Sequence, residues 1–105
     1  MSLSVNFMGL PLKNPIIAAA GPWCRDAAAM QKAIDAGAAA VVTETITLEK
    51  SHIVSPRVFY RQGEVYNTTL YSTMTLEEVE QEAELLHKGD AFLICNIRGT
   101  TPSEL

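Results

Sequence analysis

Three apolar stretches of the sequence are each followed by residues that could hold a flat, polar ring. The first ends in small residues, Ala20 and Gly21, which would let such a ring approach the backbone closely. Thr45 follows the second and Asn96 the third, and both side chains can donate and accept hydrogen bonds, as a heterocycle's edge requires. The same residues also fit structural roles, because Ala-Gly can pack, threonine can cap a helix and asparagine can close a turn. Spacing alone leaves both interpretations open.

A parallel sheet would bring these candidates together. The apolar runs 16–20, 38–43 and 92–97 are typical of strands that are buried on both faces. Between the first two runs, Asp26 is suited to cap a helix that Gly37 would end. Strand, helix and strand in this order indicate a right-handed βαβ unit. We therefore expect the candidates at the carboxyl ends of the strands, where α/β folds place their sites.

A hairpin should precede the first buried strand. Residues 4–8 alternate in the manner of a strand, and 12–14 should form a short return strand. Residues 9–11 would make the turn, and Pro15 would end the pairing.

The connection 45–75 is much longer than the usual loop of an α/β unit, and such loops are usually functional or disordered. It should contain a second hairpin, 57–61 against 65–68, that turns at Gln62-Gly63. This connection is the first place to look for substrate contacts.

A second helix should follow. Thr75 and Glu78 have the spacing of a capping box, and Gly89 should end the helix. A second capping pattern, Thr101 with Glu104, predicts that another helix begins just before the last residue, which we interpret as a truncated chain. The apolar face of the first of these helices would consist of Leu76, Val79, Ala83 and Leu86.

Composition excludes several classes of function. Hydrophobic residues make up 48% of the 105 residues and charged residues 19%, which is typical of a globular domain. A net charge of −4 argues against nucleic acid as a partner. No apolar run is long enough to span a membrane. Cys24 and Cys95 lack metal-type spacing, so we expect no metal and two reduced thiols in a cytoplasmic protein.

Taken together, the segments resemble the dihydroorotate dehydrogenase family. The resemblance covers nearly all of the chain. No single segment is specific, but the segments occur in order and at suitable intervals. Two of them, 53–57 and 67–72, are most similar to the dihydropyrimidine dehydrogenase branch. The others are 4–10, 12–15, 18–21, 37–48 and 96–99.

The resemblance implies an α/β fold, the (β/α)8 TIM barrel, of which residues 1–105 would supply the N-terminal hairpin and about the first three strands of a single FMN-binding domain. It also implies hydride transfer between a dihydropyrimidine-type C–C bond and FMN. The family's general base lies beyond Leu105, so no catalytic residue is assigned. The implied FMN contacts are Ala20, Gly21, Glu44, Thr45 and Asn96, and the implied contacts of a pyrimidine-like substrate are Glu44, Asn67, Thr68, Thr69, Leu70 and Tyr71.

Glu44 departs from the family, which has a lysine between two threonines at this position. A carboxylate there would repel reduced flavin and a substrate carboxylate such as that of orotate. Protonation of Glu44, a pairing with Arg98 or a cationic substrate would relieve this repulsion. The alternatives are thus a related flavin barrel with another substrate, or a non-catalytic barrel remnant that binds a partner through the acidic helix.

For the other reactive side chains we mainly expect structural roles. Cys24 is expected to be an inert loop thiol, Cys95 a core residue, and His52 and His87 surface residues. Trp23 would either line the flavin pocket or pack over the barrel end. The complete protein is expected to be a homo-oligomer, and its electron acceptor stays open between fumarate, a nicotinamide reached through an electron-transfer subunit, and an iron–sulfur chain.

Overall fold

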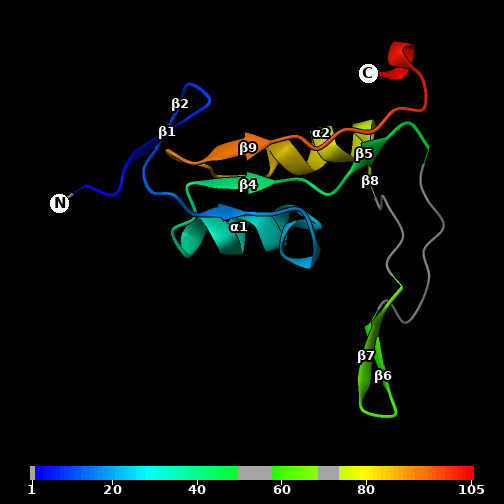
Figure 1. Ribbon diagram of the computed structural model, residues 1–105. Helices are drawn as coiled ribbons and strands as arrows, with labels where there is room; N and C mark the ends of the chain where they lie inside the picture. Colours follow the sequence, from blue (N-terminus) through cyan, green and yellow to red (C-terminus); the bar gives the residue numbers. More distant parts are fainter. Residues whose placement is uncertain (1, 50–57, 69–73) are drawn as a thin grey trace.

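The structure is a computed structural model that describes residues 2–49, 58–68 and 74–105. It has a mixed α/β architecture in which small sheets are accompanied by two α-helices (Figure 1). Its centre is a parallel sheet of β3 (Ile17–Ala18), β4 (Ala40–Val42) and β9 (Phe92–Ile94), in the order β3-β4-β9. Since α1 connects β3 to the parallel β4, the predicted βαβ unit is confirmed.

Helix α1 (Ala27–Asp35) begins and ends where the sequence predicts. The Asp26 carboxylate accepts a hydrogen bond from the Ala29 N–H at 2.8 Å, and Gly37 adopts a φ of 106° just after the helix. A residue far along the chain completes this N-terminus, because the Glu82 carboxylate accepts a hydrogen bond from the Ala27 N–H at 2.6 Å.

Helix α2 (Leu76–Glu84) begins with the predicted capping box. Thr75 and Glu78 each accept a hydrogen bond from the other's backbone N–H. The helix stops well before Gly89, so that predicted end is wrong. Its last turn contains no basic residue to favour the carbonyl end, and the chain instead turns so that Leu86 enters the core.

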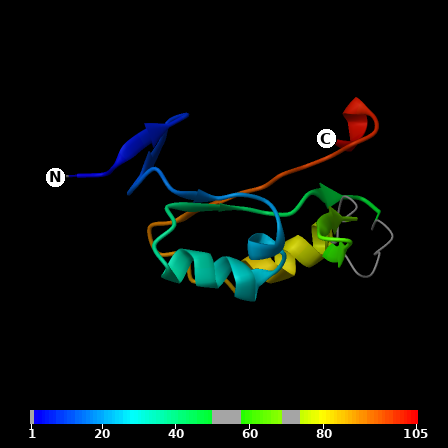
Figure 2. The same cartoon turned by 60° about the horizontal axis from the view of Figure 1, so that its bottom comes forward.

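One face of the central sheet is covered by α1 and α2, which Figure 2 shows on the same side. Val41 faces this side and packs with Met30, Ile34 and Leu86. Gln31 of α1 contacts the segment that follows α2. Its side-chain oxygen accepts a hydrogen bond from the His87 N–H at 2.9 Å, and its side-chain N–H donates to the His87 carbonyl at 3.2 Å. Leu76, expected on the apolar face, is 51% exposed because it lies at the start of the helix, while Val79 and Leu86 are buried.

The other sheet face is less completely covered. Ala40 lies there with Leu12 of the N-terminal hairpin and with half-buried side chains of the neighbouring strands. The expectation of three strands buried on both faces is therefore met only by β4, since β3 and β9 are half-buried. Each of these two pairs with β4 alone within its sheet.

The N-terminal hairpin consists of β1 (Val5–Phe7) and β2 (Leu10–Leu12), and its turn lies one residue earlier than predicted. Met8 and Gly9 both have positive φ, 50° and 85°, as a tight two-residue hairpin turn requires. The Asn6 side chain accepts a hydrogen bond from the Gly9 N–H at 3.0 Å and so holds this turn. The return strand consequently begins at Leu10 and not at Leu12.

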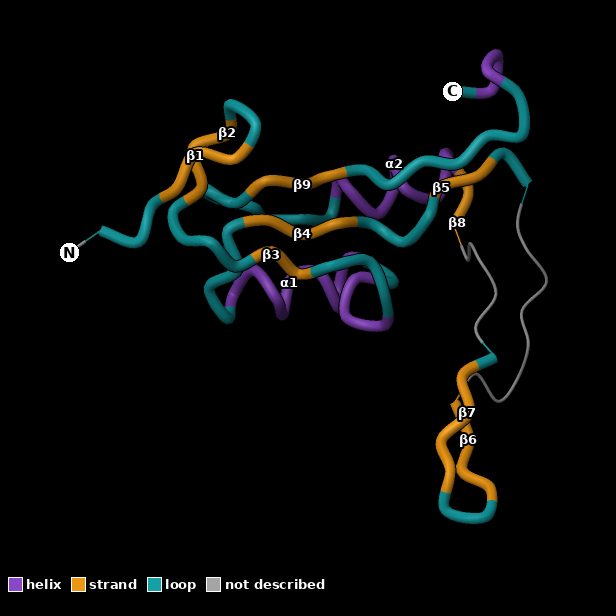
Figure 3. The backbone as a smooth tube through the Cα atoms, viewed as in Figure 1, coloured by secondary structure: helices purple, strands orange, loops and turns teal. Residues whose placement is uncertain are grey.

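The second hairpin, β6 (Val58–Arg61) with β7 (Glu64–Asn67), confirms the predicted turn at Gln62-Gly63, where φ is 51° and 80°. Figure 3 shows it extending away from the central sheet. Its two strands are joined by stacked rings of Phe59 and Tyr66, with centroids 5.2 Å apart.

The remaining elements are short. Strand β5 (Ile46–Thr47) pairs in parallel with β8 (Met74–Thr75). Two 3-10 turns occur at η1 (Pro22–Cys24) and η2 (Pro102–Glu104). The capping box predicted at the second does not form, because the Thr101 hydroxyl pairs with the Ser103 hydroxyl at 3.0 Å and makes no cap bond to the Glu104 N–H. Among the described residues, no helix is both long and apolar enough to cross a membrane.

Candidate functional site

Thr45 and Asn96 come together at the carboxyl ends of β4 and β9. The Asn96 side-chain amide donates a hydrogen bond to the Thr45 hydroxyl at 2.9 Å, and both side chains are half-buried. Strands β4 and β9 end a few residues before Thr45 and Asn96. Because the strands pair in parallel, both residues lie at the same edge of the sheet. The structure thus brings together two of the residues that the sequence selected for binding a ring edge.

Thr43 supports this pair, and sequence reasoning missed it. Its side chain is fully buried, and its hydroxyl accepts a hydrogen bond from the Asn96 N–H at 3.0 Å. The Asn96 carbonyl in turn accepts from the Ile46 N–H at 2.7 Å. The available signal was a polar residue at the end of an otherwise apolar run, directly before the candidates Glu44 and Thr45.

Gly21 leaves open space beside the end of β3. Its φ of 152° and ψ of −164° lie in a region that is essentially restricted to glycine. A Cβ built on this residue would meet no atom within 4 Å. Ala20 is exposed and Gly21 half-buried. The backbone here is accessible, as the approach of a flat ring would require.

Glu44 is buried, with only 8% of its surface exposed. Its charge acts on the thiol of Cys24, which lies fully buried below the end of β3 and points to the Ala18 carbonyl at 3.5 Å. Burial raises the pKa of the Cys24 thiol, a backbone hydrogen bond from Val42 lowers it, and the negative charge of Glu44 raises it further. A protonated, unreactive thiol is the result, in agreement with the inert loop cysteine that the sequence suggested.

A hollow of about 370 Å³ lies farther along the same two chain segments, beyond β5 and β9. It is lined by Thr47, Leu48, Glu49, Arg98, Gly99, Thr100 and Glu104. Its walls are polar, and both charges are present in them. Glu104 is held here by the N–H and hydroxyl groups of Thr100, which lower the pKa of its carboxyl.

Two of the expected substrate contacts, Asn67 and Thr68, lie apart from the Thr45–Asn96 pair. Asn67 ends β7 opposite Val58, and it and Thr68 are exposed on the hairpin that lies away from the sheet in Figure 1. Thr69, Leu70 and Tyr71 lie outside the described residues, and so does His52.

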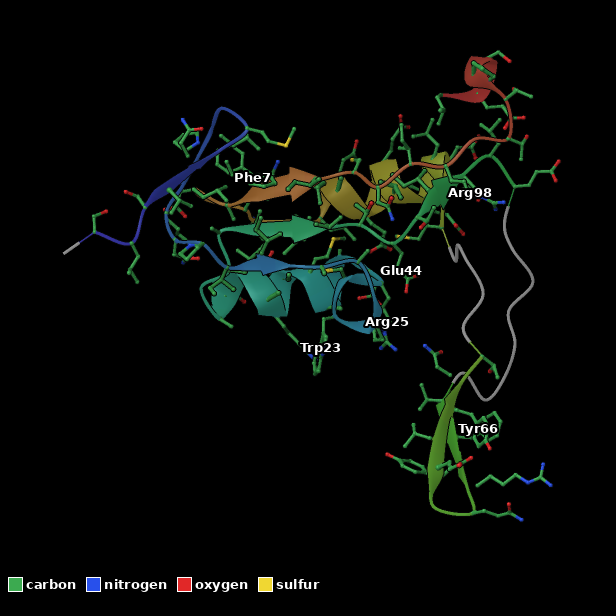
Figure 4. All side chains as sticks on the ribbon, viewed as in Figure 1. Phe7, Trp23, Arg25, Glu44, Tyr66 and Arg98 are labelled. Carbon is green, nitrogen blue, oxygen red and sulfur yellow. The ribbon has the colours of Figure 1, made fainter. Side chains whose placement is uncertain are left out.

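Three further expectations can be compared with the structure. Trp23 is 77% exposed and points away from the central sheet in Figure 4, so among the described residues it does not pack over the strand ends. Cys95, expected in the core, is exposed because β9 already ends at Ile94. His87 lies at the surface as predicted. Within the described ranges, no cluster of His, Cys, Asp or Glu side chains could hold a metal ion.

Comparison with known proteins identifies a relative. No family model matches the chain. It is 32% identical over 105 residues to the catalytic subunit of dihydroorotate dehydrogenase B (NAD(+)) of Methanocella arvoryzae (strain DSM 22066 / NBRC 105507 / MRE50). The match covers 99% of this chain and 35% of that protein, so the chain spans about a third of the length of this relative. The resemblance seen in the sequence is thereby confirmed: the chain is a homologue of the N-terminal region of a dihydroorotate dehydrogenase catalytic subunit.

Proposed function

We propose that residues 1–105 form the N-terminal part of an FMN-dependent oxidoreductase domain, a (β/α)8 barrel that transfers hydride between a dihydropyrimidine-type C–C bond and the flavin. The relative's name supports the reaction class. The observation that carries the proposal is the hydrogen-bonded pair of Thr45 and Asn96 at the carboxyl edge of parallel strands. In α/β folds this edge is where cofactors and substrates bind.

The pair suits the edge of a flavin ring. Its internal hydrogen bond uses one donor of the Asn96 amide and one lone pair of the Thr45 hydroxyl. The Asn96 side-chain oxygen then remains as an acceptor and the Thr45 O–H as a donor. If the amide is turned over, its two N–H groups remain as donors and the Thr45 oxygen as an acceptor. A flavin edge carries neighbouring C=O and N–H groups that match this arrangement. The open backbone at Gly21 would admit the ring face, with Ala20 beside it.

Bound FMN would accept the hydride in this reaction, and the protein would supply position and electrostatics. Thr45 and Asn96 would orient the ring edge. We also propose that the segment after β7 contacts the substrate and that a general base comes from a part of the complete protein outside these residues. The substrate contacts would be Asn67, Thr68, Thr69, Leu70 and Tyr71.

The negative charge of Glu44 favours an uncharged substrate. Glu44 directly precedes Thr45, so we propose that its buried carboxylate disfavours a second negative charge at the flavin edge, and burial strengthens the effect because it lowers the effective dielectric constant. A dihydropyrimidine without a carboxylate, such as dihydrouracil or dihydrothymine, avoids this repulsion, whereas dihydroorotate does not. We therefore propose the uncharged class, and homo-oligomers with a separate electron-transfer subunit remain part of the proposal.

The test uses the complete protein as its gene encodes it. After reconstitution with FMN, the protein is mixed anaerobically with dihydroorotate, dihydrouracil or dihydrothymine, and flavin bleaching is followed by stopped-flow absorbance. We expect FMN to bind and the two uncharged substrates to bleach it faster than dihydroorotate does. Bound flavin that none of the three reduces would remove this substrate class. Absence of flavin binding would favour the non-catalytic alternative, in which the acidic helix α2 binds a partner.

A further inference from the structure

The strand that leads to the proposed flavin edge contains an irregularity. Val42 pairs with Ile94, and Ile46 pairs with Ile97, both in parallel. Three residues, Thr43 to Thr45, separate the first pairing from the second on one strand, whereas two residues, Cys95 and Asn96, separate them on the other. One extra residue is therefore inserted between β4 and β5, which is the definition of a β-bulge. Bulges are rare in parallel sheets and are found preferentially beside functional sites, where they redirect side chains.

The hydrogen bonds around the bulge show how it is closed. The Thr43 N–H donates to the Ile94 carbonyl at 2.9 Å, as in a regular ladder. The next bond of a regular ladder would join the Asn96 N–H to the Thr43 carbonyl, but the Thr43 hydroxyl accepts it at 3.0 Å. The ladder resumes with the Ile46 N–H on the Asn96 carbonyl at 2.7 Å and the Arg98 N–H on the Ile46 carbonyl at 3.0 Å. A side chain thus supplies the acceptor where the backbone leaves the sheet.

The consequence concerns Thr45 and Asn96. Without the extra residue, alternation along the strand would continue unchanged and Ile46 would occupy a different place in the register. With it, Thr45 can reach the Asn96 amide at 2.9 Å while Ile46 still enters the core. Asn96 is fixed from three directions, through its N–H, its carbonyl and its side chain.

We propose that Thr43 is a positioning residue for the flavin edge: its buried hydroxyl holds the bulge closed and thereby sets Asn96 and Thr45 in the geometry that binds FMN. This inference rests on the proposed function. Thr43 itself touches no cofactor in this scheme. It acts through the Asn96 backbone, and its hydroxyl, not its methyl group, carries the role.

The experiment compares FMN affinity among three variants of the complete protein. Thr43→Val keeps the shape of the side chain and removes the acceptor, and Thr43→Ser keeps the hydroxyl. Val41→Ala is the matched control. Val41 lies two residues before Thr43 and is equally buried, but its side chain has no hydrogen-bonding group and packs in the cluster with α1. Dissociation constants come from titration of FMN fluorescence, and thermal unfolding of the flavin-free protein reports stability.

We expect Thr43→Val to weaken FMN binding by about tenfold, the size expected when a buried N–H loses its acceptor. Thr43→Ser should stay within about twofold of the wild type, and so should Val41→Ala, even though it lowers the unfolding temperature. Equal affinity of Thr43→Val and wild type would overturn the inference and leave the proposed function standing. Equal losses in Thr43→Val and Val41→Ala would also overturn it, since general destabilisation would then explain both. Failure of the wild type to bind FMN would overturn the inference together with the proposed function.

Discussion

The side chains of Asn96 and Thr45 are hydrogen-bonded at 2.9 Å although 51 positions separate them in the sequence. If the two act as one unit toward the flavin, removing either should have nearly the effect of removing both. We expect Thr45→Val and Asn96→Leu each to weaken FMN binding by about tenfold, and the double variant to be only slightly weaker than either. Fluorescence titration of the four proteins measures this. Strictly additive losses would mean that the residues bind independently.

Glu44 should set the charge preference of the site. Replacing this buried carboxylate with lysine restores the charge that the family has there, so Glu44→Lys should increase the rate of flavin reduction by dihydroorotate relative to dihydrouracil. Glu44→Gln should have a smaller effect in the same direction, because it removes the negative charge without adding a positive one. Stopped-flow reduction with both substrates tests this. The electrostatic explanation fails if Glu44→Lys leaves FMN affinity and both rates unchanged.

Glu82 should stabilise the protein through a helix to which it does not belong. Its carboxylate accepts from the Ala27 N–H at 2.6 Å, where the positive end of the α1 dipole favours an anion. Glu82→Ala should lower the free energy of unfolding by about 1–2 kcal/mol. Glu80→Ala removes an exposed glutamate from the same helix and should have little effect. Urea unfolding followed by circular dichroism compares the two, and equal losses would contradict a specific capping role.

The two cysteines should differ sharply in reactivity. Cys95 is exposed, whereas Cys24 is fully buried and the pKa of its thiol is raised, mainly by burial. Iodoacetamide at neutral pH should therefore alkylate Cys95 first, which peptide mass spectrometry can locate. Cys95→Ser should remove the rapid phase, and Cys24→Ser should leave it in place. Rapid modification of Cys24 in the folded protein would contradict the structure.

The same shift predicts a loss of stability in alkaline solution. The folded protein holds the Cys24 proton more tightly than the unfolded chain does, so the contribution of this group to stability is complete below the ordinary thiol pKa of 9.0. It decreases as the pH rises through the higher pKa of the folded state, because the unfolded chain releases its proton first. Cys24→Ala should abolish this part of the alkaline dependence, which urea unfolding at several pH values above neutrality can measure.

Local signals in the sequence predicted local structure well. The Asp26 cap, the Thr75–Glu78 capping box and the Gln62-Gly63 turn each depend on residues within a few positions, and all three occur. Three other local predictions were wrong: the first turn lies at Met8 and Gly9, so the return strand begins earlier, α2 ends before Gly89, and the Thr101–Glu104 capping box does not form.

Contacts between distant residues could not be predicted in the same way. The bond from the Asn96 N–H to Thr43 depends on a register shift that no alternation pattern of either segment reveals. The Glu82 cap of α1 required knowledge of how the two helices lie against each other. For the same reason the sequence selected Thr45 and Asn96 as separate candidates but did not show that they touch.

The order in which a ribosome delivers the chain gives the Glu82 contact a further meaning. Helix α1 emerges with an incomplete N-terminus, and its missing partner is translated 55 residues later. The His87 backbone, whose N–H and carbonyl bond the Gln31 side chain of α1, emerges later still. The βαβ unit formed by β3, α1 and β4 therefore lacks these contacts of the finished fold when its last strand leaves the ribosomal tunnel, and it can gain them only after α2 has been synthesised.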